Sequence, residues 1–284
     1  MQPPRANVRS YFLVPELPEV ETIARGLANA LTGKTIAGAD VRLPRVVSPE
    51  PRRFKRAIAG ERVEKVGRRG KYVVATLGSG RALVVHLRMT GRLIVQPSAT
   101  AEPEPYTNVR LTFTDGTALC FADARTFGRM RLAGPQDAWA ADLGVEPLSE
   151  EFSYERFSGL LDRRTTPIKA FLLDQRRIAG IGNIYACEAL WEARIRPTRP
   201  AGLLSRPARA RLHAAIGSVI RKAIQMRGTS VDDYVDAEGL RGGFQNELVC
   251  YGRDGKACRR CGKTIVRTVL AQRGTWWCRG CQKH

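Results

Sequence analysis

The stretch CRRCGKTIVRTVLAQRGTWWCRGC, residues 258–281, decides the fold of the C-terminal end of the chain. Its cysteines follow the spacing C-x2-C-x16-C-x2-C, which fits a tetrahedral four-thiolate zinc site on two knuckles. Four thiolates leave no position open for water, so the expected cofactor is one structural Zn²⁺. The ligands would be Cys258, Cys261, Cys278 and Cys281.

Between the knuckles, TIVRTVLA and GTWWC are typical of two strands, joined across Gln272, Arg273 and Gly274. The sequence therefore predicts a zinc ribbon. The other three cysteines, at positions 120, 187 and 250, lie in apolar stretches and are expected to be buried small hydrophobic residues.

The chain around this ribbon is strongly basic. Its 284 residues include 47 Lys and Arg against 27 Asp and Glu, a formal net charge of +20. A polyanion is the expected partner, and nucleic acid is favoured over a membrane surface because the basic residues are spread through patterned segments. No apolar run reaches the length of a membrane span and no signal peptide is visible, so we expect a cytoplasmic protein.

Upstream of the ribbon, from about Ser149, the apolar period is helical. A stripe runs from Leu212 to Ile224 and ends at Gly228. The turn Gly180-Ile181-Gly182-Asn183 opens another helix, and glycines there can bring backbone N–H groups close to a phosphate. A tight corner is the alternative interpretation of this turn.

The first half of the chain has a different period. A helix is predicted from Pro18 to just before Gly33, and from Thr35 to Leu132 the apolar period is two. Asp115-Gly116 is typical of a hairpin turn, and Ala99 to Pro105 is expected to be a loop. The pattern predicts a mainly antiparallel β domain with a helix at its start.

Five further motifs resemble the formamidopyrimidine-DNA glycosylase family, bifunctional bacterial enzymes that excise oxidised purines. They are PELPEVET (15–22), GKY (70–72), HLRMTG (86–91), DARTFG (123–128) and AGIGNIY (179–185), in the family's order and followed by the four cysteines. The resemblance implies an α+β fold: an N-terminal β-sandwich with flanking helices, then a helix-two-turns-helix domain and a zinc-ribbon finger. Its domains would be 15–147, 148–249 and 250–284.

The resemblance also implies the chemistry. Pro15 would attack the sugar C1′ through its α-amine and form a Schiff base, after which β,δ-elimination cuts the strand. Glu16 would act as acid or base on the opening sugar ring, with Glu19 as a supporting acid. Lys71 would contact the phosphate of the lesion and assist base removal, and Arg273 would grip phosphates from the zinc finger.

Other matching positions imply contacts with DNA. Met89, Arg125 and Phe127 would fill the space left by a flipped-out nucleotide, and Asn183 would hold a phosphate. Asn108 stands where the family often has a histidine that contacts DNA. The segment Thr229 to Phe244 resembles a loop that closes over the lesion, with Ser230, Tyr234 and Phe244 as its candidate residues.

Pro15 is preceded by fourteen residues, and an amide nitrogen cannot attack a sugar. We therefore expect residues 1–14 to be a start-site artefact, with translation beginning at a GTG codon read as Val14 and the initiator then removed. The expected partner is double-stranded DNA with oxidised bases or abasic sites, bound by a monomer. Two alternatives remain: an endonuclease VIII-like enzyme for oxidised pyrimidines, and a non-catalytic damaged-DNA-binding protein if Pro15 stays blocked.

Overall fold

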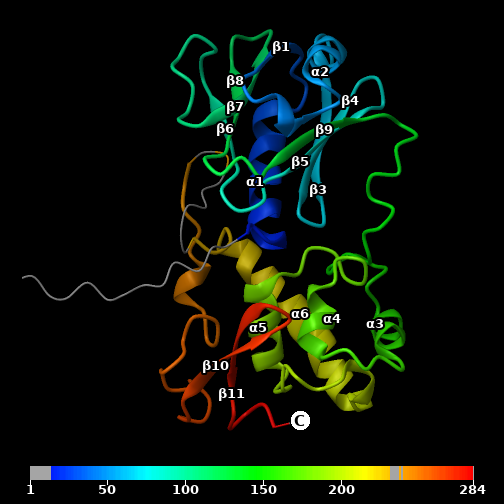
Figure 1. Cartoon of the computed structure of the whole chain (residues 1–284), viewed down its shortest axis with the longest axis vertical. Helices are drawn as coiled ribbons and strands as arrows, with labels where there is room; N and C mark the ends of the chain where they lie inside the picture. The colour runs from blue at the N-terminus through cyan, green and yellow to red at the C-terminus, as the bar shows by residue number, and fades with distance from the viewer. Residues whose placement is uncertain (1–13, 231–236, 238, 284) are drawn as a thin grey trace, which may run out of the picture.

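The computed structural model describes residues 14–230, 237 and 239–283. Figure 1 shows two halves, a β-rich half that begins with α1 and a helical half that carries a terminal hairpin. The helices are α1 (Leu17–Leu31), α2 (Pro51–Ile58), α3 (Tyr154–Leu161), α4 (Ile168–Leu173), α5 (Asn183–Glu192) and α6 (Arg206–Gln225). The strands are β1 (Ile36–Val41), β2 (Val47–Ser48), β3 (Val63–Arg69), β4 (Tyr72–Leu77), β5 (Ala82–His86), β6 (Arg92–Gln96), β7 (Thr107–Phe113), β8 (Ala118–Ala122), β9 (Arg129–Ala133), β10 (Ile265–Leu270) and β11 (Arg273–Cys278).

Helix α1 joins the two halves. A capping box between Glu16 and Glu19 begins it, with Pro18 in the first turn. Its apolar stripe packs into the core of the β-rich half, whereas Leu17, at its first position, is buried in the core of the helical half. The predicted helix is therefore confirmed, and it reaches from one core to the other.

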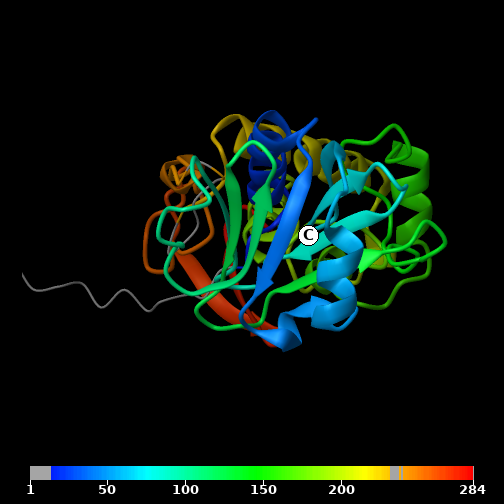
Figure 2. The same cartoon turned by 90° about the horizontal axis from the view of Figure 1, so that it is seen from above.

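The β-rich half is a sandwich, as expected. One sheet has four strands in the order β1-β7-β8-β6, and the other has five in the order β2-β9-β5-β4-β3. All neighbouring strands pair antiparallel except β2 and β9. The predicted turn at Asp115-Gly116 joins β7 to β8, with Gly116 at φ +84°, and Figure 2 shows this half from above.

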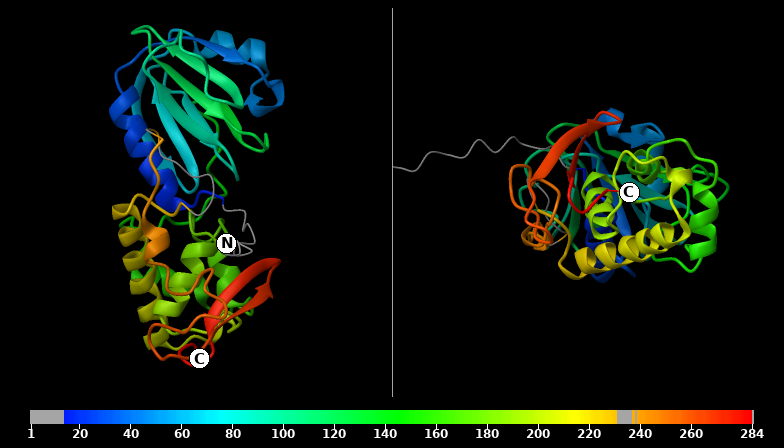
Figure 3. Two further views of the ribbon diagram at one scale, coloured as in Figure 1. Left: turned by 90° about the vertical axis from the view of Figure 1, so that its left-hand side faces the viewer. Right: turned by 90° about the horizontal axis from the view of Figure 1, so that it is seen from below.

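In the helical half, α6 packs on α5 and their apolar faces close a second core. The hairpin β10–β11 packs on α5 through a third core that contains Cys187, Tyr251 and Trp276. Figure 3 shows this hairpin extending from the lower half toward the junction with the sandwich. Cys120, Cys187 and Cys250 are fully buried, as predicted.

The sequence prediction misplaced the turn of the ribbon. Leu270 pairs with Arg273, so the turn consists of Ala271 and Gln272, both with positive φ, and Arg273 and Gly274 belong to β11. Gly274 is required for another reason, because a Cβ there would lie 2.8 Å from the Trp276 ring. No helix in the described part of the chain is long and apolar enough to cross a membrane.

Candidate active site

A cavity of about 650 Å³ opens at the junction of the two halves and the ribbon. We call it the junction cavity. It brings together six of the predicted site residues from distant parts of the chain: Glu16, Lys71, Met89, Phe127, Asn183 and Arg273. Pro15 is buried beside it, between the cavity residues Val14 and Glu16.

The carboxylate of Glu16 lies at the N-terminus of α5. It accepts hydrogen bonds from the backbone N–H groups of Ile184 (3.0 Å) and Tyr185 (3.4 Å). Gly182 makes this approach possible, since a Cβ there would lie 2.2 Å from the carboxyl carbon of Glu16. The glycine turn therefore holds a carboxylate of the protein at these two N–H groups, where the sequence had suggested a phosphate.

Glu16 is only 3% exposed, and this decides its protonation. Burial raises its pKa to about 7, the nearby charge of Glu19 raises it further, and Lys71 and the two N–H groups act in the opposite direction. A carboxyl with a pKa near neutrality can both donate and accept a proton under physiological conditions.

Glu19 is buried behind Glu16 and holds three segments together. It accepts hydrogen bonds from the backbone N–H of Glu16 (2.9 Å), from the backbone N–H of Thr229 (2.7 Å) and from the Tyr185 hydroxyl. Burial raises its pKa as well. Glu19 thus ties the start of α1 to α5 and to the first residue of the predicted capping loop.

Lys71 follows Gly70 (φ +57°) in the tight turn between β3 and β4. Glu146, from the segment that connects the halves, accepts hydrogen bonds from Arg68 (2.6 Å), Arg69 (3.0 Å) and the backbone N–H of Gly70. The basic run before Lys71 is therefore part of an ion-pair clamp between the halves. Burial lowers the pKa of Lys71, and the charge of Arg273 lowers it too. The carboxyl groups of Glu16 and Glu19 partly offset these effects.

The ribbon is fixed against α4 and α5 next to Arg273. The carbonyl of Gly274 accepts hydrogen bonds from the Asn183 amide (3.1 Å) and from the Lys169 ammonium (2.8 Å), which also donates to Thr275 Oγ1 (2.7 Å). Lys169 is fully buried, and our sequence analysis missed it because a lysine in an apolar run carries no spacing signal. Asn183 thus positions the hairpin that carries Arg273.

Phe127 and Arg125 lie on the loop between β8 and β9. Asp123 holds this loop by accepting hydrogen bonds from the N–H groups of Arg125 (3.2 Å) and Gly128 (2.7 Å). Phe127 is 48% exposed, and the Arg125 guanidinium lies 5.2 Å from its ring centre. An exposed aromatic ring on a fixed loop is suited to stacking on a base.

Asn108, the predicted DNA contact at the family's histidine position, lies in β7 beneath the loop of Arg125 and Phe127. It is 8% exposed, and its amide donates to the backbone carbonyl of Asp123 (3.0 Å). The structure thus gives its side chain a supporting role beneath the loop of Arg125 and Phe127, where it has little surface to offer DNA.

The junction cavity also contains residues that the sequence analysis did not select, notably His86, Gln175 and Tyr251. His86 belongs to the HLRMTG motif, which was the available signal. Burial, followed by the charges of Arg88 and Lys71, lowers its pKa to about 3, so His86 is neutral in the free protein. Glu188 accepts hydrogen bonds from the N–H groups of residues 249–251 and so fixes the backbone at Tyr251.

The candidate capping residues lie at different depths. Ser230 Oγ accepts a hydrogen bond from the Gly242 N–H (2.8 Å), which closes the base of the loop. Phe244 is 3% exposed and packs 5.7 Å from the Tyr185 ring centre. Tyr234 lies outside the described residues.

The four cysteines of the ribbon form a site that fits Zn²⁺. Their sulfur atoms all lie within 4.8 Å of one another, at 3.9 Å for Cys258 and Cys281 and 3.5 Å for Cys261 and Cys278. A tetrahedral Zn²⁺ with bonds of about 2.3 Å separates its sulfur ligands by about 3.8 Å. The Trp191 indole N–H, 3.4 Å from Cys258 Sγ, would support that thiolate.

The sandwich, the helical unit and the zinc ribbon enclose a buried carboxyl and a lysine in a chain of net charge +20, an arrangement suited to an enzyme that acts on nucleic acid. Residues 14–130 match the formamidopyrimidine-DNA glycosylase N-terminal domain, residues 143–235 its H2TH domain, and residues 255–283 the zinc finger found in FPG and IleRS. The chain belongs to the formamidopyrimidine-DNA glycosylase family, whose members work in base excision repair.

Individual relatives agree along nearly the whole chain. The formamidopyrimidine-DNA glycosylase of Chloroflexus aggregans is 46% identical over 272 residues, 95% of this chain and 98% of the relative. Three solved complexes of the Lactococcus lactis protein are similar to this chain. Each match covers 95% of this chain and 100% of the Lactococcus lactis chain. They contain abasic-site DNA (34% identity, TM-score 0.88), N7-benzyl-Fapy-dG DNA (35%, 0.88) and oxidised-pyrimidine DNA (35%, 0.87).

Proposed function

We propose that this chain excises oxidised purines, such as 8-oxoguanine and formamidopyrimidines, from double-stranded DNA and then cuts the strand by β,δ-elimination. The observation that carries the proposal is the position of Pro15 and Glu16, directly before the first residue of α1. They lie beside a cavity that is also lined by Lys71 and Arg273. Lactococcus lactis complexes with abasic-site and N7-benzyl-Fapy-dG DNA support this substrate class.

Pro15 is the nucleophile of the proposed reaction. Its amine nitrogen forms a bond to C1′ and gives up its proton, the glycosidic bond breaks, and the base leaves with one proton in exchange. The sugar ring then opens at O4′ and leaves an iminium between Pro15 and C1′. Loss of a proton from C2′ expels the 3′ phosphate, a second elimination expels the 5′ phosphate, and water releases the sugar fragment from Pro15.

Glu16 is the proton donor to O4′ in this scheme. Its pKa of about 7 leaves a protonated fraction at neutral pH, and its two backbone donors stabilise the carboxylate that remains after transfer. Lys71 and Arg273 bind the phosphates beside the lesion, where two neighbouring cations stabilise the charge of the backbone. Met89, Arg125 and Phe127 fill the gap left by the flipped nucleotide.

We assign catalysis to residues 15–147, DNA binding and lesion capping to 148–249 and the zinc finger to 250–284. Bacterial relatives support a site of action on the bacterial chromosome in the cytoplasm. The proposed chemistry requires Pro15 as a free N-terminal amine. Intact-mass measurement of protein from its native source should therefore show a chain that begins at Pro15.

Borohydride trapping on an 8-oxoguanine duplex tests the nucleophile. We expect a covalent complex whose tryptic map places the DNA on Pro15, and no complex when Pro15 is preceded by an uncleaved residue. Trapping through another residue in a chain that keeps its N-terminal extension would overturn the assignment. A chain that excises the base without any trapped complex would overturn the lyase step.

Oxidised pyrimidines are a second candidate substrate. The Lactococcus lactis complex with oxidised-pyrimidine DNA supports acceptance of such a base. Excision rates on matched duplexes that carry an oxidised purine or an oxidised pyrimidine decide which class is preferred, and we expect the purine to be excised faster.

A further inference from the structure

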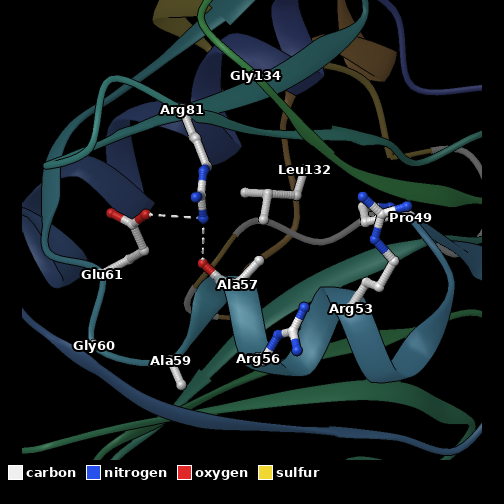
Figure 4. A pocket seen from close by; sticks show the side chains of 10 residues that line it. All are labelled: Pro49, Arg53, Arg56, Ala57, Ala59, Gly60, Glu61, Arg81, Leu132 and Gly134. Carbon is white, nitrogen blue, oxygen red and sulfur yellow. Dashed lines mark hydrogen bonds and ion pairs between the residues drawn. The ribbon is translucent and has the colours of Figure 1, made fainter.

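The β-rich half contains a second large pocket, remote from the junction cavity. It has a volume of about 640 Å³ and is lined by Arg53 and Arg56 from α2, by Arg81 from the turn before β5, and by Glu61 and six small or apolar positions: Pro49, Ala57, Ala59, Gly60, Leu132 and Gly134. We call it the arginine pocket. Figure 4 shows the three arginines around it.

Strand pairing places this pocket at the opposite end of the five-stranded sheet. His86 pairs with Arg129 at the end that faces the junction cavity, and Ala82 pairs with Ala133 at the end beside Arg81 and Gly134. Five residues of strand separate the two sites by about 15 Å of sheet. A duplex held in the junction cavity therefore has the sandwich between itself and the arginine pocket.

The basic residues of α2 are exposed and unneutralised. Within the described residues, no carboxylate lies within 4 Å of the charged groups of Arg52, Arg53, Lys55 or Arg56, whereas Arg68, Arg69 and Arg209 each contact at least one. The helix itself is rigidly mounted. Phe54 and Ile58 are fully buried, and the Glu50 side chain caps its first turn.

Arg81 is held in a fixed position at the edge of the pocket. Its Nη1 donates to the carbonyl of Ala57 (2.8 Å) and lies 3.5 Å from Glu61, and these are the two dashed contacts in Figure 4. Glu61 is in turn occupied by Ser79, whose hydroxyl donates to it at 2.5 Å. The acid therefore belongs to the support of Arg81, and Arg53 and Arg56 remain available to a ligand.

We propose that the arginine pocket and α2 bind the phosphate backbone of a second DNA duplex while the first occupies the junction cavity. Arg53 and Arg56 are three residues apart and so lie on one side of the helix, where planar guanidinium groups can each bind two phosphate oxygens. Among the described residues, the lining has no aromatic side chain on which a nucleotide base could stack or a protein partner could anchor. A polyanionic backbone is the ligand that this chemistry fits, and a second DNA-binding surface of this kind lets the protein pass directly between DNA segments.

The test uses the full chain with the junction cavity filled by a duplex that carries a tetrahydrofuran abasic analogue. Binding of a second, undamaged fluorescent duplex is followed by anisotropy and by sedimentation. We expect a complex with two duplexes at low salt. Arg53→Glu/Arg56→Glu should weaken the second binding event at least about tenfold and reduce its salt slope by about two, because each arginine neutralises one phosphate. Affinity for the first duplex and the excision rate on a short duplex should remain within about twofold.

The matched control is Arg156→Glu/Arg163→Glu, at two exposed residues in α3 and just after it, which makes the same change in net charge. It should leave the second binding event unchanged. If the control weakens it equally, the effect is one of net charge and the proposal is wrong. The same conclusion follows if only one duplex binds, or if the pocket takes a nucleoside triphosphate or an acidic protein in preference to DNA. If circular dichroism shows that the α2 variant folds poorly, Arg53→Gln/Arg56→Gln provides the same comparison. The excision rate of that variant shows whether a loss of second-duplex binding comes with a loss of the glycosylase activity or occurs without it.

Discussion

Two opposing effects act on the carboxyl group of Glu16: burial disfavours its negative charge, and the N-terminus of α5 favours it. The balance leaves its pKa at about 7 instead of 4.5. An unfolded chain releases this proton at lower pH than the folded chain does. Folding therefore takes up a proton at this position between about pH 4.5 and pH 7.

The substitution Glu16→Gln should remove that proton uptake. The contribution of Glu16 to stability is fully present below about pH 4.5 and is lost as the pH rises through about 7. Over this window, the unfolding free energy of the wild type should therefore fall by on the order of 3 kcal/mol more than that of the variant. Urea denaturation at a series of pH values measures the difference. Parallel curves for the two proteins would show that Glu16 does not titrate in this range.

Lys71 and Met89 line the same cavity but differ in chemistry, so their alanine variants should fail differently. Lys71→Ala should slow base excision more than it weakens binding to an abasic site, because the lysine acts next to the reacting nucleotide. Met89→Ala should impair recognition of the lesion and leave cleavage of a preformed abasic site less affected. Single-turnover rates on the two substrates separate these effects, and an equal loss of both steps in both variants would contradict the assignment.

At the scale of elements, the junction depends on how closely α1 can approach the start of α5. Gly182→Ala would place a Cβ 2.2 Å from the carboxyl carbon of Glu16. We expect a loss of about 1–3 kcal/mol in unfolding free energy and a large loss of excision as Glu16 is displaced from its two donors. Thermal denaturation and the excision rate measure the two effects.

Gly159→Ala is the matched control for this prediction. Gly159 lies in α3 with nothing within 4 Å of an added Cβ, so alanine should stabilise the helix by about 0.5–1 kcal/mol and leave excision unchanged. Equal effects of the two substitutions would mean that the contact between Gly182 and Glu16 does not matter.

Elements with a strong local signal could be predicted from the sequence. The stripe of α1 and the Asp115-Gly116 turn were found from periodicity and turn chemistry, because both depend on neighbours within a few residues. The ribbon turn was misplaced since Ala271 and Gln272 adopt positive φ without being glycine, whereas Gly274 is small to make room for Trp276. Periodicity also missed α2, whose eight residues include four basic side chains and only two buried ones, Phe54 and Ile58.

The site could be predicted only in part, for a related reason. Family motifs gave Glu16, Lys71 and Arg273, but no local pattern indicates that a carboxylate from residue 16 accepts hydrogen bonds from residues 184 and 185. The same holds for Lys169 and for the Glu146 clamp, since both are defined by partners more than 70 residues away. Such contacts follow from the packing of whole elements.

At the scale of the molecule, the zinc site supports the position of Arg273. The buried residues of the ribbon share a single core with α5. Loss of the metal should therefore release β10 and β11 from that helix. Purified protein should contain one zinc per chain by elemental analysis. Removal with a strong chelator, or Cys278→Ser, should lower affinity for abasic-site DNA at least about tenfold, because the released ribbon no longer holds its basic side chains against phosphates. A zinc-free protein with unchanged DNA affinity would contradict this prediction.

The clamp at Glu146 and the carboxylate of Glu16 have a joint consequence for when the enzyme can react. Glu16 belongs to the sandwich through the chain and to the helical half through its hydrogen bonds, so its proton affinity reports whether the two halves are docked. Separation at this seam would remove the backbone donors and admit water, and the carboxyl would revert to an ordinary exposed acid that is ionised at neutral pH. The ability of Glu16 to donate a proton at neutral pH is thus a property of the assembled interface, and separating the two halves would remove it.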